Sequence, residues 1–220
     1  MTAPSALKRL QHPGARLFLL AFLTLYLELA FIRFTGAEVL YLGYFANFVL
    51  ISVFLGIGTG FLLADRSVDL FRFVPPLILL LIVFVVTTHI DATVLRDHLG
   101  QLFFGQGGTA SRLPLWLALP FIFLSFSILF ACISQETGRS FKPFAPLVAY
   151  TLDILGSLTG IAVFTLQSIF ERPATEWFAI GMLGVLFLSR GWWRLTAAVC
   201  GIAVVWTVTA SAPSHYTRWS

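Results

Sequence analysis

The chain has 220 residues, of which 58% are hydrophobic and only 11% are charged. A soluble domain of this length cannot bury so much apolar surface, so lipid must cover the excess and a soluble globular protein is excluded. The net charge is +4, but the lysines and arginines are scattered at the ends of apolar runs. This placement is typical of topology signals and predicts neither a clustered basic face nor a nucleic-acid partner.

Seven apolar runs in chain order predict an all-α, polytopic helical bundle embedded in the membrane. A helix rises about 1.5 Å per residue and the hydrocarbon core is about 30 Å thick, so runs of this kind can cross it. A basic tail over residues 1–16 precedes a single transmembrane domain over 17–211, and a linker over 212–220 follows it. Within the domain we expect spans at 17–34, 41–64, 73–88, 113–133, 144–170, 175–189 and 192–210.

The longest connection, residues 89–112, contains a segment with helical periodicity. Over residues 90–103, apolar side chains such as Leu95, Leu99 and Phe103 fall near helical spacing, opposite polar residues such as Asp97. This pattern predicts one amphipathic helix that lies on the membrane surface. The connection after the fourth run, residues 134–142, is expected to be a loop.

Polar side chains interrupt the apolar runs at five positions: Glu28, Arg33, Asn47, Tyr150 and Asp153. Because charged groups cost several kcal/mol at bilayer depth, we expect Glu28 and Asp153 to face the bundle interior within an intramembrane polar network. Two interpretations of this network remain open. It could carry protons or a substrate, or it could only fix which helices pack together.

Glycines recur at close spacing in two of the runs: Gly56, Gly58 and Gly60 in the second, and Gly156 and Gly160 in the fifth. No predicted strand precedes the first group, so its context excludes a phosphate-binding loop. Glycines allow helix backbones to approach closely. We therefore expect all five to lie at helix–helix contacts.

The sequence predicts neither a metal site nor a bound cofactor. Four possible ligands lie near one another in the third connection: His89, Asp91, Asp97 and His98. The two histidines are nine residues apart, which does not bring metal ligands together on one helix face. Cys132 and Cys200 lie in apolar runs without a C-x-x-C motif, so we expect two buried thiols.

The positive-inside rule orients the predicted spans. With seven spans and the N-terminus in the cytoplasm, nine basic residues lie inside: Lys8, Arg9, Arg16, Arg66, Arg72, Arg139, Lys142, Arg190 and Arg194. Five lie outside: Arg33, Arg96, Arg112, Arg172 and Arg218. The C-terminus is then expected on the outer side.

Four stretches resemble the membrane-embedded spermidine synthase-like proteins of bacteria. They are LELAFIR (27–33), YFANFVLISVFLGIGTGFLLA (44–64), AYTLDILGSLTGIAVFTL (149–166) and HYTRWS (215–220). In that family several N-terminal helices precede a Rossmann-type aminopropyltransferase-like domain, so the resemblance implies a multi-pass protein of the bacterial inner membrane. No Gly-rich loop after a strand and no acidic ribose-binding residue occurs in the 220 residues, so no catalytic residue is carried over.

Two functions of different classes follow. The resemblance implies a membrane module that anchors or serves an aminopropyltransferase-like catalytic domain absent from these residues, with Glu28 and Asp153 supplying negative charge for a polyamine or related cation. The alternative is a small independent transporter or channel in which the same two acids form the coupling site. The lipid bilayer is a partner in both cases, and whether the chain belongs to an enzyme stays open.

Overall fold

The computed structural model describes residues 12–38, 46–88, 95–96, 102–103 and 115–211. Most of these residues are helical, as the apolar runs predict. The described parts contain seven long helices: α2 (Pro13–Glu38), α4 (Ala46–Leu62), α5 (Val74–Thr88), α6 (Leu115–Phe141), α7 (Pro146–Ile169), α8 (Ala174–Leu188) and α9 (Trp193–Ser211). A short 3₁₀ helix, η1 (Phe71–Phe73), leads directly into α5.

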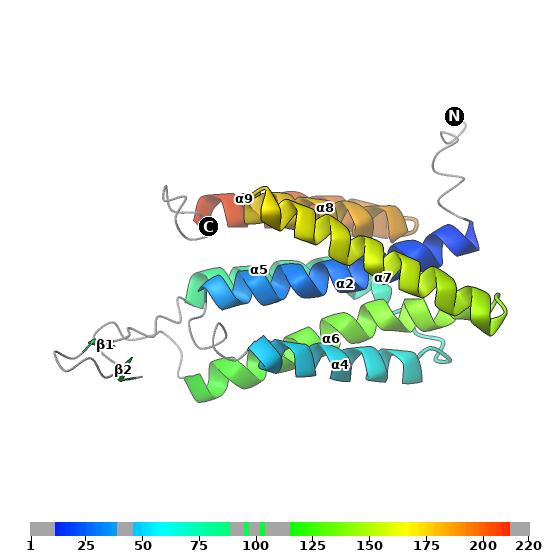
Figure 1. Cartoon of the computed structure of the whole chain (residues 1–220), viewed down its shortest axis with the longest axis horizontal. Helices are drawn as coiled ribbons and strands as arrows, with labels where there is room; N and C mark the ends of the chain where they lie inside the picture. Colours follow the sequence, from blue (N-terminus) through cyan, green and yellow to red (C-terminus); the bar gives the residue numbers. More distant parts are fainter. Residues whose placement is uncertain (1–11, 39–45, 89–94, 97–101, 104–114, 212–220) are drawn as a thin grey trace.

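Helix α2 lies at the centre of the bundle and contacts α4, α5, α6, α7 and α8. Helix α4 packs along α6, and α9 packs along both α5 and α8. In Figure 1, α2 and α5 lie between the α4–α6 pair and the α8–α9 pair, and α7 crosses over α2. Successive helices alternate in direction, so α2, α5, α7 and α9 begin at the end of the bundle where α4, α6 and α8 finish.

Four helices are long and apolar enough to cross a membrane: Pro13–Ala37, Trp116–Phe141, Pro146–Ile169 and Trp193–Ala210. Three shorter apolar helices accompany them: Asn47–Leu62, Phe71–Thr87 and Ala174–Leu188. Large apolar side chains stand on the outer faces of both kinds, such as Leu62 on α4 and Ile202 on α9, which are 83% and 73% exposed. A surface of this kind needs lipid to cover it, so the chain is a membrane protein.

Two helices extend beyond their predicted limits at the same end of the bundle. Helix α2 begins at Pro13, so Arg16 is helical and not part of a tail. Helix α6 continues to Phe141, so the loop predicted over 134–142 is wrong for all but its last residue. The physical reason is that Gln135, Glu136 and Thr137 are buried and find polar partners there, so the helix does not have to end where the apolar run ends.

The amphipathic helix predicted over residues 90–103 is wrong at the residues that the structure describes. Leu95–Arg96 and Leu102–Phe103 form two short antiparallel strands, β1 and β2, with Leu95 opposite Phe103. The other residues of the predicted helix lie outside the described ranges. Gly100 separates the two strands in the sequence, and a glycine disfavours a helix interior by about 1 kcal/mol.

Candidate functional site

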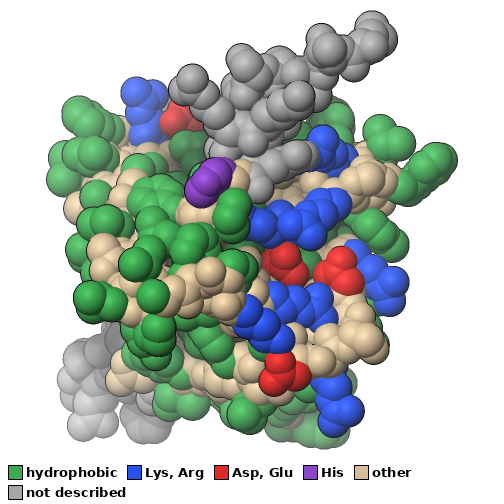
Figure 2. All heavy atoms as spheres, turned by 90° about the vertical axis from the view of Figure 1, so that its right-hand side faces the viewer, with side chains coloured by type: hydrophobic (Ala, Val, Ile, Leu, Met, Phe, Trp, Pro, Cys, Tyr) green, Lys and Arg blue, Asp and Glu red, His purple; other side chains and the backbone are tan. Residues whose placement is uncertain are grey.

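Charged side chains gather at one end of the bundle. They come from the start of α2, the turn between α4 and η1, η1 itself, the end of α6 and the residue after it, the turn between α8 and α9, and the start of α9. These residues are Arg16, Asp65, Arg66, Asp69, Arg72, Glu136, Arg139, Lys142, Arg190 and Arg194. Figure 2 looks onto this face, where blue and red side chains form a group bordered by apolar ones. We call it the charged end.

Glu136 on α6 joins two arginines at the charged end. Arg16 donates to Glu136 Oε1 from Nε at 3.0 Å and from Nη2 at 2.6 Å, and its Nη1 donates to the Leu188 carbonyl at 3.0 Å. Arg139 Nη1 lies 3.7 Å from the other carboxylate oxygen. The pair of Arg16 and Glu136 is 13% and 11% exposed. One carboxylate therefore links the ends of α2, α6 and, through Arg16, α8.

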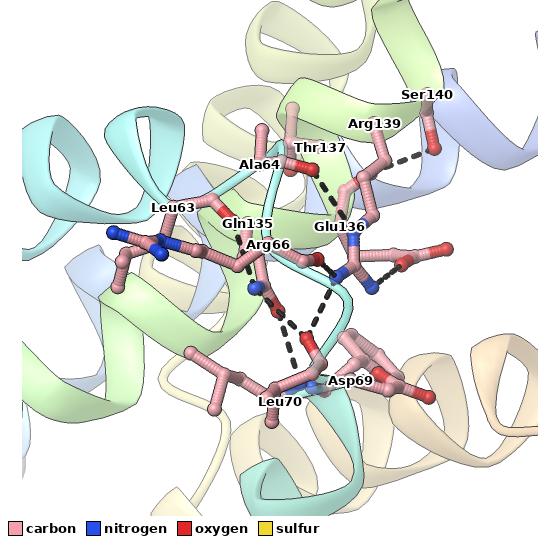
Figure 3. Close-up of polar contacts among 12 residues, drawn as sticks. Leu63, Ala64, Arg66, Asp69, Leu70, Gln135, Glu136, Thr137, Arg139 and Ser140 are labelled. Carbon is pink, nitrogen blue, oxygen red and sulfur yellow. Dashed lines mark hydrogen bonds and ion pairs between the residues drawn. The ribbon is translucent and has the colours of Figure 1, made fainter.

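The turn between α4 and η1 is held by two side chains of α6 (Figure 3). Gln135 Nε2 donates to the carbonyls of Leu63 and Val68, both at 3.0 Å, and its Oε1 accepts the Leu70 N–H at 2.9 Å. Arg139 reaches the same turn and donates to the Val68 carbonyl at 2.7 Å. These bonds satisfy backbone carbonyls of the turn that follows α4. The conformation of the turn is therefore held by α6 and does not depend on the turn's own residues alone.

A pocket of about 390 Å³ opens at the charged end, between α2, η1, α6 and the α8–α9 turn. Its polar lining contains four arginines and two acids: Arg16, Arg72, Arg139, Arg190, Asp69 and Glu136. Phe71, Leu188 and Trp193 supply apolar walls. The formal charge of the lining is positive, since the arginines outnumber the acids by two.

Arg72 lies on η1 with its guanidinium near two aromatic rings. Its Cζ is 4.7 Å from the Phe73 ring centre and 5.9 Å from that of Trp193. Such cation–π contacts fix the orientation of a guanidinium. The Nε atom is buried and has no hydrogen-bond partner among the described residues. A buried donor without a partner is uncommon in folded proteins and calls for an explanation.

A further ion pair stands at the rim of the charged end. Lys142 Nζ lies 2.5 Å from Asp65 Oδ1, and both side chains are exposed. The hydrogen bond from the Lys142 ammonium, together with its charge, holds the pKa of the Asp65 carboxyl below its usual value. Because water screens exposed pairs, this contact orders the rim more than it stabilises the fold.

The opposite end of the bundle has its own polar group. The Tyr26 hydroxyl donates to Gln167 Oε1 at 2.5 Å and lies 3.0 Å from the Trp177 carbonyl. Arg33 donates to Ser168 Oγ, and its guanidinium lies 5.1 Å from the Trp177 ring centre. These contacts join α2 to α7 and α8.

The structure does not bring together the five side chains expected to form an intramembrane network. Glu28 is buried, 6% exposed, and has no hydrogen-bond or ion-pair partner among the described residues. Asn47 is exposed on α4, Tyr150 is 59% exposed on α7, and Asp153 is half-buried. Arg33 belongs to the polar group described above.

Glu28 and Asp153 are far apart along the bundle. Gly156 of α7 lies against Phe18 of α2, and Gly160 lies against Phe22. This register places Asp153 level with Ala15, thirteen residues before Glu28. At about 1.5 Å per residue the two acids are about 20 Å apart along the helix axis. They do not form one site.

Four of the five selected glycines lie at close helix contacts. A Cβ on Gly56 would lie 2.4 Å from the Ser127 carbonyl oxygen, and one on Gly60 would lie 2.6 Å from that of Ala131. Gly156 and Gly160 meet backbone oxygens of α2 at 2.4 and 2.6 Å in the same way. Gly58 has open space around its Cα, so the packing contact expected for it is wrong.

Metal ligands and thiols add nothing to the site. Among the described residues, no group of three or more His, Cys, Asp and Glu side chains could hold a metal ion. His89, Asp91, Asp97 and His98 lie outside the described ranges. Cys132 and Cys200 are both free and buried.

The sequence interpretation missed the charged end as a site. It treated Arg16, Arg72, Arg139 and Arg190 as separate topology signals, and the expectation that no basic cluster forms is wrong. A signal was present in the sequence, because polar residues at 135–139 directly follow the fourth apolar run at helical spacing. Their partners on α2 and in the 63–70 turn lie at least 65 residues away in the chain.

No protein-family model, no curated protein and no solved structure matches this chain. What the chain does therefore has to be inferred from its own residues.

Proposed function

We propose that the chain is a seven-span membrane module that serves an aminopropyltransferase-like catalytic partner at its charged end. The observation that carries the proposal is the fixed polar platform formed by Arg16, Gln135, Glu136 and Arg139. A surface whose side chains are held by hydrogen bonds and ion pairs between helices can bind a soluble protein without the cost of becoming ordered first. The resemblance of residues 27–33 and 149–166 to spermidine synthase-like membrane proteins supports the class of partner.

The alternation of the helices supports seven spans. Among the described residues, seven cations lie at the charged end: Arg16, Arg66, Arg72, Arg139, Lys142, Arg190 and Arg194. Arg33 and Arg172 lie toward the opposite end. By the positive-inside rule the charged end is cytoplasmic, where a soluble synthase-like enzyme finds its substrates. The two shortest α-helices of the described parts, α5 and α8, have 15 residues each and reach about 22 Å, and local thinning of the bilayer can accommodate this length.

The geometry gives less support to a transporter and to polyamine binding. A coupling site built from Glu28 and Asp153 needs the two acids to lie close together, whereas their register separates them by about 20 Å. The pocket at the charged end carries more arginines than acids, so it repels a polyamine. The proposal therefore omits cation binding.

Cysteine labelling tests the orientation. In a background with Cys132→Ser and Cys200→Ser, we expect Ser67→Cys at the charged end to react with a membrane-impermeant maleimide only after the membrane is opened. Glu171→Cys, in the turn between α7 and α8, should react from outside in intact cells. The reverse pattern would overturn the orientation.

Co-purification tests the partner. The tagged full chain is isolated from native membranes, and the eluate is assayed for transfer of an aminopropyl group to putrescine. We expect activity with the wild-type chain and less with Glu136→Gln, which removes the carboxylate that pairs with both arginines of the platform. Arg172→Gln at the opposite end is the matched control and should keep the activity. Absence of activity from the wild-type eluate would reject the proposed partner.

A further inference from the structure

We infer that the pocket at the charged end binds a phosphate-bearing anion. The inference does not rest on the proposed function, because it concerns the lining of one cavity in this chain. The pocket brings four arginines together within about 390 Å³. This volume lies within the range of about 300–1,000 Å³ that is usual for small-molecule sites.

Two of the four arginines are already committed to the protein. Arg16 and Arg139 both lie against Glu136. The single carboxylate of Glu136 can satisfy the donors of two guanidinium groups only in part. Arg72 and Arg190 take part in no hydrogen bond or ion pair with the described residues. Asp69, the other acid of the lining, accepts the Phe71 N–H at 3.1 Å and is exposed. Two of the four arginines in the pocket lining therefore have no anionic partner among the described residues.

Arg72 is oriented before any ligand arrives. Its guanidinium lies beside Phe73 and Trp193, and its buried Nε lacks an acceptor among the described residues. Burying such a donor away from water costs free energy unless another acceptor takes the place of the water. An oxygen of a bound anion supplies that acceptor. The guanidinium fork is also the side chain best matched to the oxygens of a phosphate.

The charge of the lining selects phosphate over a single carboxylate. The arginines exceed the acids by two, and a phosphomonoester carries roughly −1.5 to −2 charges near neutral pH. Such a group arises from two sources, a soluble phosphorylated metabolite or the headgroup of an anionic lipid. Trp192, next to the pocket-lining Trp193, is 80% exposed. Tryptophans concentrate at the membrane interface, so a headgroup can reach this depth.

The first arm of the test uses a soluble probe. The full chain is placed in phosphatidylcholine nanodiscs and titrated calorimetrically with glycerol 3-phosphate at fixed ionic strength. We expect saturable binding, and a Kd raised at least about tenfold by Arg72→Gln and by Arg190→Gln, each of which removes a charged hydrogen-bond donor. Arg66→Gln, at the same end but outside the pocket lining, makes the same charge change and should alter Kd by less than about twofold.

The second arm identifies the source of the phosphate. Native mass spectrometry compares retention of phosphatidic acid and of phosphatidylcholine by the same variants. Binding of glycerol 3-phosphate in the first arm, without selective retention of phosphatidic acid, supports a soluble ligand. Selective retention of phosphatidic acid that Arg72→Gln and Arg190→Gln abolish, without binding of the soluble probe, supports a headgroup.

Two results would overturn the inference. One is absence of binding in both arms. The other is an equal loss with Arg66→Gln, which would show a general attraction to positive charge. Arg190 is exposed, so Arg190→Gln should keep the wild-type melting temperature and decide the matter even if Arg72→Gln fails to fold.

Discussion

Arg16 and Glu136 lie 120 residues apart in the chain, yet two nitrogens of the Arg16 guanidinium donate to one oxygen of the Glu136 carboxylate. Both side chains are largely buried, so water screens their attraction only weakly. The Arg139 guanidinium approaches the other oxygen. Glu136 is thus both a link between helices and part of the pocket wall.

A double-mutant cycle measures this link. We expect Glu136→Gln to destabilise the protein more than Arg16→Gln, because it removes the partner of two arginines and not of one. The coupling free energy between the two positions should be about 1–3 kcal/mol. Reversible unfolding in detergent micelles measures it, and additive effects of the two substitutions would contradict the assignment. Lys142→Gln, which removes the exposed pair with Asp65, is the control and should have the smaller effect.

Glycine substitutions within one helix test the contact between α4 and α6. Gly56→Ala places a Cβ 2.4 Å from the Ser127 carbonyl oxygen, so the two helices must separate. We expect a loss of about 1–3 kcal/mol in unfolding free energy, as for other overpacked sites. Gly58→Ala is the matched control. It has open space and should be neutral or stabilise the helix by up to about 1 kcal/mol. Equal melting temperatures for the two variants would count against the contact.

The glycines of α4 show how much of the fold could be predicted from the sequence. Apolar runs predict seven helices because each run is long and continuous, and those helices form. The spacing of four residues between Gly56 and Gly60 also places them on one helix face, whereas Gly58 points elsewhere. The spacing alone therefore distinguishes Gly58 from the other two glycines. The register between α4 and α6 was not available, because it depends on contacts between distant segments.

The partners that bury the polar side chains of the charged end could not be predicted, for the same physical reason. Hydropathy treats Gln135, Glu136 and Arg139 as polar and therefore places them in a loop. Their burial depends on partners in the 63–70 turn and at Arg16. Short-range patterns determine where an apolar helix begins, but they do not show which polar groups another segment will satisfy.

The pair of Asp65 and Lys142 predicts a pH dependence. Because the Lys142 ammonium lowers the pKa of Asp65 in the folded protein, this pair stabilises the fold above the unfolded pKa of Asp65, about 3.9. The contribution disappears as the pH falls through the lower folded value. Asp65→Asn should remove this component, so wild type and variant should converge in melting temperature at acidic pH. A difference that stays constant down to the lowest pH would contradict the pairing.

Glu28 offers a test between the two interpretations of the intramembrane acids. Its side chain is 6% exposed, without a hydrogen-bond or ion-pair partner among the described residues. A buried polar group in this position costs stability, so Glu28→Met should raise the unfolding free energy by about 1–3 kcal/mol. Leu29→Met, on the next position of α2, is the control for introducing a methionine and should change it by less than about 1.5 kcal/mol.

Thermal unfolding in detergent gives the result of the Glu28 test, and its sign decides the outcome. If the carboxyl fixes helix partners, then Glu28→Met removes a favourable contact and the protein melts at a lower temperature. A higher melting temperature means that the acid is kept at a cost to the fold, which is the pattern of a residue retained for function. The absence of a described partner favours the second result.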